Sequence, residues 1–143
     1  MFAGPNGSGK STLKSVLPKE LLGVYLNPDE IEKEIRCQDF LDFKAYQVAA
    51  EPNEALSFFR DSTFLISAGL GDAARHLDFE KGRLSFSNTE VNSYFASVAV
   101  EYLRRKLLQR RISFTVETVM SHSGKVELLA EAQQIGDRTY LYF

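Results

Sequence analysis

Apolar and polar positions alternate along the chain in the patterns typical of short strands and amphipathic helices. Residues 1–3 are largely apolar and predict a short first strand ahead of a glycine-rich loop. A helix is expected over residues 9–17, because Pro18 cannot supply the amide that helix continuation needs. The apolar residues 24–26 then predict a short buried strand.

A second helix is expected over residues 29–36. Pro28 suits an early helical position, and Asp29 suits the positive end of the helix dipole. Glu32 and Arg36 are four residues apart, so we expect an ion pair on the surface of this helix.

The pattern is weakest between residues 38 and 88. Helical spacing extends over residues 45–50 and 54–67. Within residues 79–86, the dipeptide Lys81-Gly82 indicates a turn.

The clearest helix is predicted from Thr89 to Gln109, with Asn88 as its N-cap. Apolar residues recur there at helical spacing and form one stripe, whose aromatic members we interpret as core side chains. The stripe consists of Val91, Tyr94, Phe95, Val98, Tyr102 and Leu103.

The C-terminal third predicts a strand, a helix and a further strand. Residues 112–116 are rich in β-branched and aromatic side chains, and this strand is expected to end at Glu117-Thr118. A helix is expected over residues 125–135, with Gly136 as its stop, and a strand over residues 139–143.

Alternating strands and helices predict an α/β protein with a parallel sheet flanked by helices. The fold expected is that of a P-loop NTPase or kinase, with residues 1–143 as a single core. Because the sequence stops within the last predicted strand, we expect this core to be incomplete at its C-terminal end. Its short first strand suggests the same of the N-terminal end.

Composition narrows the class of protein further. The 143 residues, 44% hydrophobic and 25% charged, suffice for one soluble domain with a core. The formal net charge of −2 argues against nucleic acid as the main partner. One basic cluster is interpreted as a solvated helix face, with a local phosphate-binding patch as the alternative. It consists of Arg104, Arg105, Lys106, Arg110 and Arg111.

Cys37 is the single cysteine, so no internal disulfide forms, which suits a reducing cytoplasm. No cysteine-protease motif surrounds it, and no catalytic role is expected. No apolar run approaches the ~18 residues that span a membrane. The N-terminus also lacks the basic and apolar regions of a signal peptide. The expected location is therefore cytoplasmic, without a membrane partner.

The most specific motif is Gly4-x-x-x-x-Gly9-Lys10-Ser11, which matches the phosphate-loop pattern at every fixed position. Backbone amides of such a loop surround the phosphates, the lysine adds charge at the β- and γ-phosphates, and the serine hydroxyl binds Mg²⁺. ATP or GTP with Mg²⁺ is the expected cofactor, and Ser11 is the metal ligand. The nucleotide-binding residues are Gly4, Pro5, Asn6, Gly7, Ser8, Gly9, Lys10, Ser11 and Thr12.

The rest of the sequence favours a kinase among phosphate-loop proteins. A signalling GTPase would carry an Asn-Lys-x-Asp segment, which is absent, and a motor or helicase needs a longer chain. Asp29 follows the second predicted strand, where an acid in small kinases takes the acceptor's hydroxyl proton or orients the acceptor. The alternative is that Asp29 only stabilises the helix dipole.

Glu117 ends a third apolar strand. Ligands of open parallel sheets bind beyond the carboxyl ends of the strands, so the Lys10 loop, Asp29 and Glu117 are expected to converge. Glu117 would hold the Mg²⁺-bound water or the acceptor, and the alternative is an exposed strand-end carboxylate. The loop that follows offers acceptor-binding or helix-capping hydroxyls and a histidine interpreted as exposed. These residues are Thr118, Ser121, His122 and Ser123.

Three blocks together resemble the zeta toxin family of phosphate-loop kinases. They are residues 3–12, residues 26–31 (Leu-Asn-Pro-Asp-Glu-Ile) and residues 114–118 (Phe-Thr-Val-Glu-Thr). A weaker fourth block covers residues 128–143. Residues 40–88 carry little of the likeness.

The resemblance implies transfer of a phosphoryl group to a sugar hydroxyl, in the studied toxins that of UDP-N-acetylglucosamine, and pairing with an antitoxin protein. Lys10 and Ser11 match the nucleotide and Mg²⁺ residues. Asp29 matches the general base, and Glu117 the glutamate of the acceptor site. Asn27 and Thr118 adjoin these positions and are further candidate substrate contacts.

Two departures from the family matter. The toxins have Glu-Gly-Thr where this chain has Glu117-Thr118-Val119. Their lid arginines lie beyond the strand in which this sequence ends, so we expect nucleotide binding with weak transfer. The alternatives are a nucleotide-binding module without kinase activity, and a kinase of another small molecule or of a nucleic-acid end.

Overall fold

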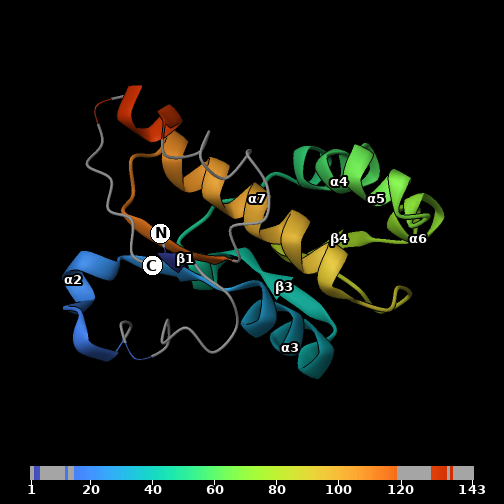
Figure 1. Cartoon of the computed structure of the whole chain (residues 1–143). Coiled ribbons are helices and arrows are strands. Elements are labelled where there is room, and N and C mark those ends of the chain that lie inside the picture. The colour runs from blue at the N-terminus through green and yellow to red at the C-terminus, as the bar shows by residue number, and fades with distance from the viewer. Residues whose placement is uncertain (1, 4–11, 13–14, 119–129, 135, 137–143) are drawn as a thin grey trace. The chain divides into compact units, whose positions relative to one another are not determined.

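The structure, a computed structural model, describes residues 2–3, 12, 15–118, 130–134 and 136 (Figure 1). In chain order its elements are β1 (Phe2–Ala3), α2 (Lys19–Leu22), β2 (Val24–Leu26), α3 (Pro28–Gln38), β3 (Phe40–Asp42), the 3₁₀ helix η1 (Phe43–Tyr46), α4 (Pro52–Arg60), α5 (Thr63–Ser67), α6 (Gly71–Arg75), β4 (Asp78–Glu80), β5 (Arg83–Ser85), α7 (Ser93–Gln109) and β6 (Phe114–Thr118).

Contacts within the chain divide it into two compact units. The first unit is Met1–Leu26 with Leu107–Phe143, and the second is Asn27–Lys106. Parallel strands and helices confirm the predicted α/β class at this coarse level. The single core over residues 1–143 stays a prediction.

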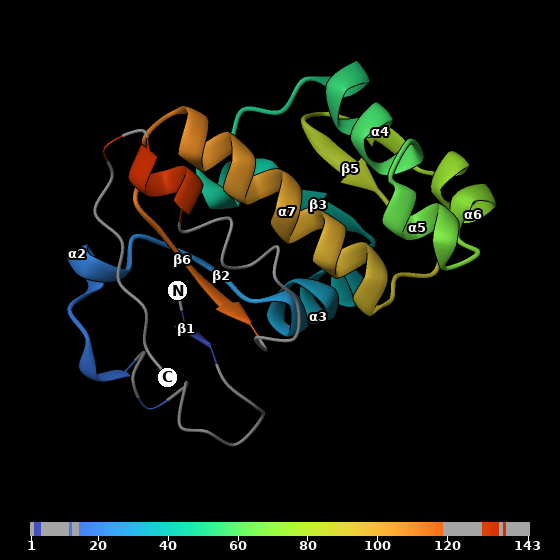
Figure 2. The ribbon, with the colours of Figure 1, turned by 45° about the horizontal axis from the view of Figure 1, so that its top comes forward.

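The first unit contains a parallel sheet in which β6 lies between β1 and β2 (Figure 2). In register, Phe2 pairs with Glu117, and Leu26 pairs with Val116. The predicted strand at residues 24–26 is confirmed. The strand expected from residue 112 begins at Phe114 instead, and its end at Thr118 agrees with the predicted end at Glu117-Thr118.

The later start of β6 has a local cause. The Ile112 amide donates to the Leu107 carbonyl at 2.9 Å, so Ile112 closes the C-terminus of α7 rather than starting the strand. The Ser113 carbonyl then accepts from the Val24 amide at 3.0 Å. At this point the backbones come so close that a Cβ at Gly23, where φ is +60°, would lie 2.2 Å from the Ser113 oxygen.

The described helical segments of the first unit agree with two predictions. Thr12, Ser15 and Val16 are helical, and the helix ends before Pro18. Residues 130–134 are helical, and Gly136 follows with φ +86°, as expected of a helix stop. The strand expected at residues 139–143 lies outside the described residues.

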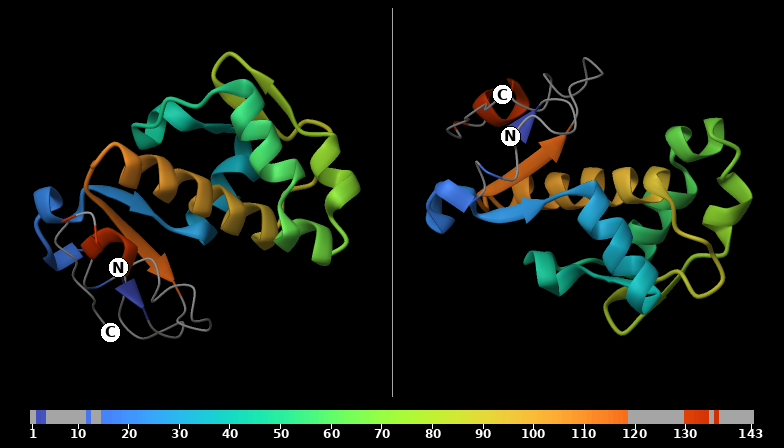
Figure 3. Two further views of the ribbon diagram at one scale, coloured as in Figure 1. Left: turned by 90° about the horizontal axis from the view of Figure 1, so that it is seen from above. Right: turned by 60° about the horizontal axis from the view of Figure 1, so that its bottom comes forward.

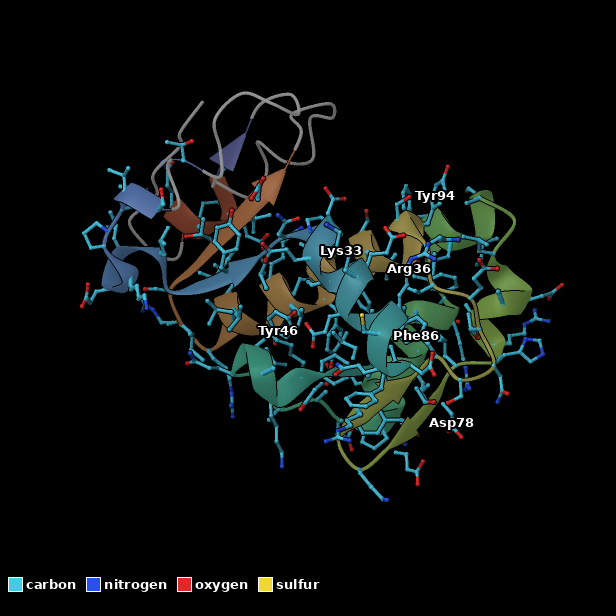
Figure 4. All side chains as sticks on the ribbon, turned by 90° about the horizontal axis from the view of Figure 1, so that it is seen from below. Lys33, Arg36, Tyr46, Asp78, Phe86 and Tyr94 are labelled. Carbon is cyan, nitrogen blue, oxygen red and sulfur yellow. The ribbon has the colours of Figure 1, made fainter. Side chains whose placement is uncertain are left out.

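The second unit begins with α3, which confirms the predicted helix and extends it to Gln38. The Asn27 side chain caps it by accepting from the Asp29 amide at 2.9 Å. Arg36 and Glu32 form the expected ion pair at 2.8 Å. Lys33 and Arg36 lie on this helix in Figure 4.

The second unit has its own antiparallel sheet, of order β3-β5-β4. β4 and β5 form a hairpin, and φ is positive at both Lys81 and Gly82, as a two-residue type I′ turn requires. The predicted turn is confirmed. Leu41 and Leu84, which pair in register, are fully buried on the core face.

Two helix predictions in this unit need correction: residues 54–67 are helical except for a break at residues 61–62, and residues 45–50 are mostly not helical. Residues 54–67 form two helices, because the Ser62 hydroxyl accepts from the Leu65 amide and starts α5 anew after α4 ends at Arg60. Over residues 45–50, helical structure stops at Tyr46, since Gln47 is left-handed with φ +58°. Figure 3 shows α4, α5 and α6 in green as successive short helices.

The long helix α7 starts at Ser93 rather than near Thr89, and Asn88 is not its cap. Asn92 takes that role by accepting from the amides of Tyr94 and Phe95. Thr89 stays outside the helix because its hydroxyl donates to the Ala73 carbonyl at 3.1 Å.

The predicted apolar stripe is buried except at Tyr94, which is 44% exposed and packs on Phe64 at 5.3 Å. Aromatic rings pack against one another within the core of this unit. Tyr102 contacts Phe43 at 5.4 Å and Phe58 at 5.2 Å between ring centroids. Phe86, labelled in Figure 4, packs edge-on against Phe95 at 5.8 Å.

Replacing Gly23 tests the close approach of β2 and β6. We expect Gly23→Ala to destabilise the protein by well over ~1 kcal/mol, because strain at positive φ adds to the clash with Ser113. Gly69→Ala is the matched control, since φ is +77° there and no atom lies within 4 Å of the added Cβ. Urea unfolding measures both variants. Equal losses would contradict the close approach.

Two tyrosine variants test how much a hydroxyl contributes to stability when it has a hydrogen-bond partner and when it has none. Among the described residues the buried Tyr102 hydroxyl has no hydrogen-bond partner, whereas the Tyr46 hydroxyl donates to Glu34 at 2.6 Å. At neutral pH, Tyr46→Phe should therefore cost ~1 kcal/mol, while Tyr102→Phe is neutral or stabilising.

Burial, reinforced by Glu54 and Glu51, raises the pKa of Tyr102 to about 12. An unfolded tyrosine ionises near the ordinary pKa of 10.0, so stability should fall between pH 10 and about 12. Thermal melts across this range should show a shallower fall for Tyr102→Phe. An unchanged alkaline profile in that variant would contradict the burial of an ionisable hydroxyl.

Candidate functional site

The phosphate-loop residues lie mostly outside the described part of the chain. Nothing of residues 4–11 is described, and this includes Lys10 and Ser11. Thr12 is helical and exposed, and its carbonyl accepts from the Ser15 hydroxyl at 2.7 Å. The assignment of this loop to nucleotide phosphates therefore rests on the motif.

The strand that leads into the loop is described, and it fixes the position of Glu117. Phe2 pairs with Glu117 and Ala3 pairs with Thr118 in the parallel register of β1 and β6. Gly4, the first residue of the motif, follows Ala3 directly. The carboxyl end of β6 thus lies beside the strand end at which the motif begins.

Tyr25 is a site residue that the sequence did not single out. Val24 and Leu26 are buried, so Tyr25 points to the opposite face of β2. It pairs with Thr115, and side chains two residues apart share a face, which places Glu117 on the same face. The Tyr25 hydroxyl donates to Glu117 Oε2.

The same face of β6 is anchored at Thr115. Its side chain is buried, and its hydroxyl donates to the carbonyl of Leu22, the last residue of α2, at 2.6 Å. This contact ties Thr115 of β6 to the end of α2, and the Tyr25 bond ties Glu117 of β6 to β2. Glu117 is half-buried, and it projects from the same face of β6 as Thr115, which these two hydrogen bonds hold in place.

Asn27 and Asp29 belong to the second unit. The Asn27 side chain caps α3, so the residue expected to contact substrate has a structural role, and its substrate role stays a prediction. Asp29 lies in the first turn of α3 and is exposed. This placement suits both roles considered for it, general base and helix-dipole acid.

The basic cluster is only partly a solvated face. Arg104 and Arg105 both bind the Glu101 carboxylate, at 2.7 Å and 2.9 Å, and Lys106 binds Glu54 at 2.5 Å. The Arg104 side chain is only 13% exposed, so that interpretation is wrong for Arg104. Acidic neighbours thus compensate the charges of Arg104, Arg105 and Lys106.

The structure describes only some of the remaining residues that the sequence analysis discussed. Cys37 is exposed on α3, and the side chain of Thr118 is not described. Ser121, His122 and Ser123 lie outside the described residues. Within the described ranges, no cluster of three or more His, Cys, Asp and Glu side chains is placed to hold a metal ion.

Comparison with known proteins identified no family for this chain. No family model, no curated protein and no solved structure matched this chain. In the part of the chain that the structure describes, no helix has the length and apolar character of a membrane span.

Proposed function

We propose that this protein is a P-loop kinase that binds ATP or GTP with Mg²⁺ and phosphorylates a hydroxyl of a small molecule. The observation that supports it is the pairing of β6 with β1. This pairing puts a carboxylate, Glu117, beside the strand end from which the phosphate-loop motif continues. Open parallel sheets bind their ligands at such ends.

In this proposal the nucleotide is held by the loop backbone and Lys10. When bound, Mg²⁺ would supply charge neutralisation at the β- and γ-phosphates, with Ser11 as its ligand. A strand-end carboxylate such as Glu117 is chemically suited to a Mg²⁺-bound water or to an acceptor hydroxyl, since both donate hydrogen bonds. We assign Glu117 to the acceptor.

In the proposed transfer step, one bond to the γ-phosphorus forms as another breaks, and a carboxylate takes the proton. The acceptor oxygen bonds to the γ-phosphorus as the bond from that phosphorus to the β–γ bridging oxygen breaks, and the nucleoside diphosphate leaves. The hydroxyl proton passes to the Asp29 carboxylate. Asp29 follows the last residue of β2 by three positions, at the start of α3.

The resemblance to zeta toxins supports a UDP-amino sugar as the acceptor and an antitoxin as a protein partner, and the single cysteine, Cys37, suits a cytoplasmic location. The second candidate is a nucleotide-binding module without kinase activity. It is favoured by the pairing of Arg104, Arg105 and Lys106 with carboxylates, because phosphoryl transfer needs cations around the phosphates.

Removing the loop lysine tests nucleotide binding. Lys10→Ala should weaken binding of a non-hydrolysable ATP analogue with Mg²⁺ at least tenfold, about 1.4 kcal/mol, because a neutral loop cannot replace the ammonium charge. Calorimetric titration measures it. Lys44→Ala, at an exposed position of η1, is the control and should bind as the wild type does. Equal affinity in the Lys10 variant would remove the phosphate-loop assignment.

Asp29→Asn separates transfer from binding. If Asp29 is the general base, the variant should keep its nucleotide affinity and lose roughly 10²–10⁴ in turnover with radiolabelled ATP and UDP-N-acetylglucosamine. Glu30→Gln is the control, because Glu30 lies in the same first turn of α3. Loss of a few tenths of a kcal/mol in both variants, with turnover retained, would reduce Asp29 to a helix-dipole residue.

A further inference from the structure

We propose that Tyr25 is a positioning residue that fixes the carboxylate of Glu117 for the acceptor. This inference rests on the proposed function, since it concerns the acceptor side of the same site. It assigns a role to a residue that no sequence motif marks, and it follows from the register of two neighbouring strands.

The geometry starts from the sheet. Tyr25 lies in the middle of β2 and pairs with Thr115 of β6. Glu117 is two residues further along β6, about 7 Å away on the same face. A phenol is long enough to bridge that distance, and its hydroxyl donates to Glu117 Oε2.

This bond matters because a glutamate side chain has three rotatable bonds, each of which is ordered when the carboxylate is held in one place. Ordering a glutamate costs up to ~2 kcal/mol of side-chain entropy, and an acceptor that had to order it would bind more weakly by that amount. Tyr25 lies in β2 between the buried residues Val24 and Leu26, so its backbone position is fixed, and its rigid ring leaves few torsions to order. Glu117 is therefore oriented before the acceptor arrives.

The second unit contains a chemically matched pair. The Tyr46 hydroxyl donates to Glu34 at 2.6 Å, and Glu34 is further held by the Gln38 amide at 3.0 Å. Glu34 lies within α3 and η1 carries Tyr46 (Figure 4). This pair joins two elements of one unit, and we assign it a structural role.

The experiment compares Tyr25→Phe, Glu117→Ala, the double variant and Tyr46→Phe. Calorimetry first measures the Mg²⁺-dependent affinity for a non-hydrolysable ATP analogue, then the affinity for UDP-N-acetylglucosamine with that analogue saturating. We expect Tyr25→Phe to keep nucleotide affinity and to bind UDP-N-acetylglucosamine about tenfold more weakly, because the acceptor must then order the Glu117 side chain itself. Tyr46→Phe should leave both affinities unchanged, and melting curves verify that each variant folds.

The double variant identifies the route of the effect. If Tyr25 acts through Glu117, Tyr25→Phe should have no further effect on acceptor affinity once Glu117 is alanine. Additive losses would overturn the inference. So would wild-type acceptor affinity in Tyr25→Phe, or no acceptor binding by the wild type while the nucleotide binds. A wild type that binds no nucleotide would overturn the proposed function itself.

Discussion

The parallel pairing of β6 with both β1 and β2 is the constraint on which the candidate site depends. A one-residue slip in this register would turn Glu117 to the opposite face, because side chains alternate along a strand. Three features oppose such a slip. Gly23 admits the Ser113 carbonyl to a position that any side chain would block, Thr115 bonds the Leu22 carbonyl, and the Tyr25 hydroxyl meets Glu117.

The proposed acceptor binding depends on a polar side chain, Glu117, that the parallel sheet does not fully bury. Val24, Leu26 and Val116 are buried, so the strands are held in place by apolar contacts. Near the end of β6, the polar side chain of Glu117 is only half-buried. In the second unit, the core combines aliphatic side chains with aromatic rings, among which Phe43 and Tyr102 pack edge to face.

Much of the local structure could be predicted from the sequence, because short-range chemistry decides it. Pro28 and Asp29 mark the start of α3, and Lys81-Gly82 marks the hairpin turn. The start of α7 was misplaced because two asparagines compete as caps, and a tertiary bond from Thr89 to Ala73 selects Asn92.

Other features were beyond sequence reasoning for a definite physical reason. The strand Asp78-Phe79-Glu80 has a single apolar residue, so no alternation is visible, and only pairing with β5 makes it a strand. Tyr25 resembles an ordinary core aromatic until the register with β6 is known. A carboxylate 92 residues away along the chain then becomes its partner.

The central claim is that nucleotide phosphates and their metal bind at the carboxyl ends of β1 and β6. Paramagnetic line broadening of backbone amides by Mn²⁺ with an ATP analogue tests it most directly, with Mg²⁺ as the diamagnetic control. The account predicts strong broadening at Ala3, Glu117 and Thr118, and weaker broadening at Gly23 and Phe114, at the opposite ends of β2 and β6. Broadening centred on Gly23 and Phe114, or none in this sheet, would contradict it.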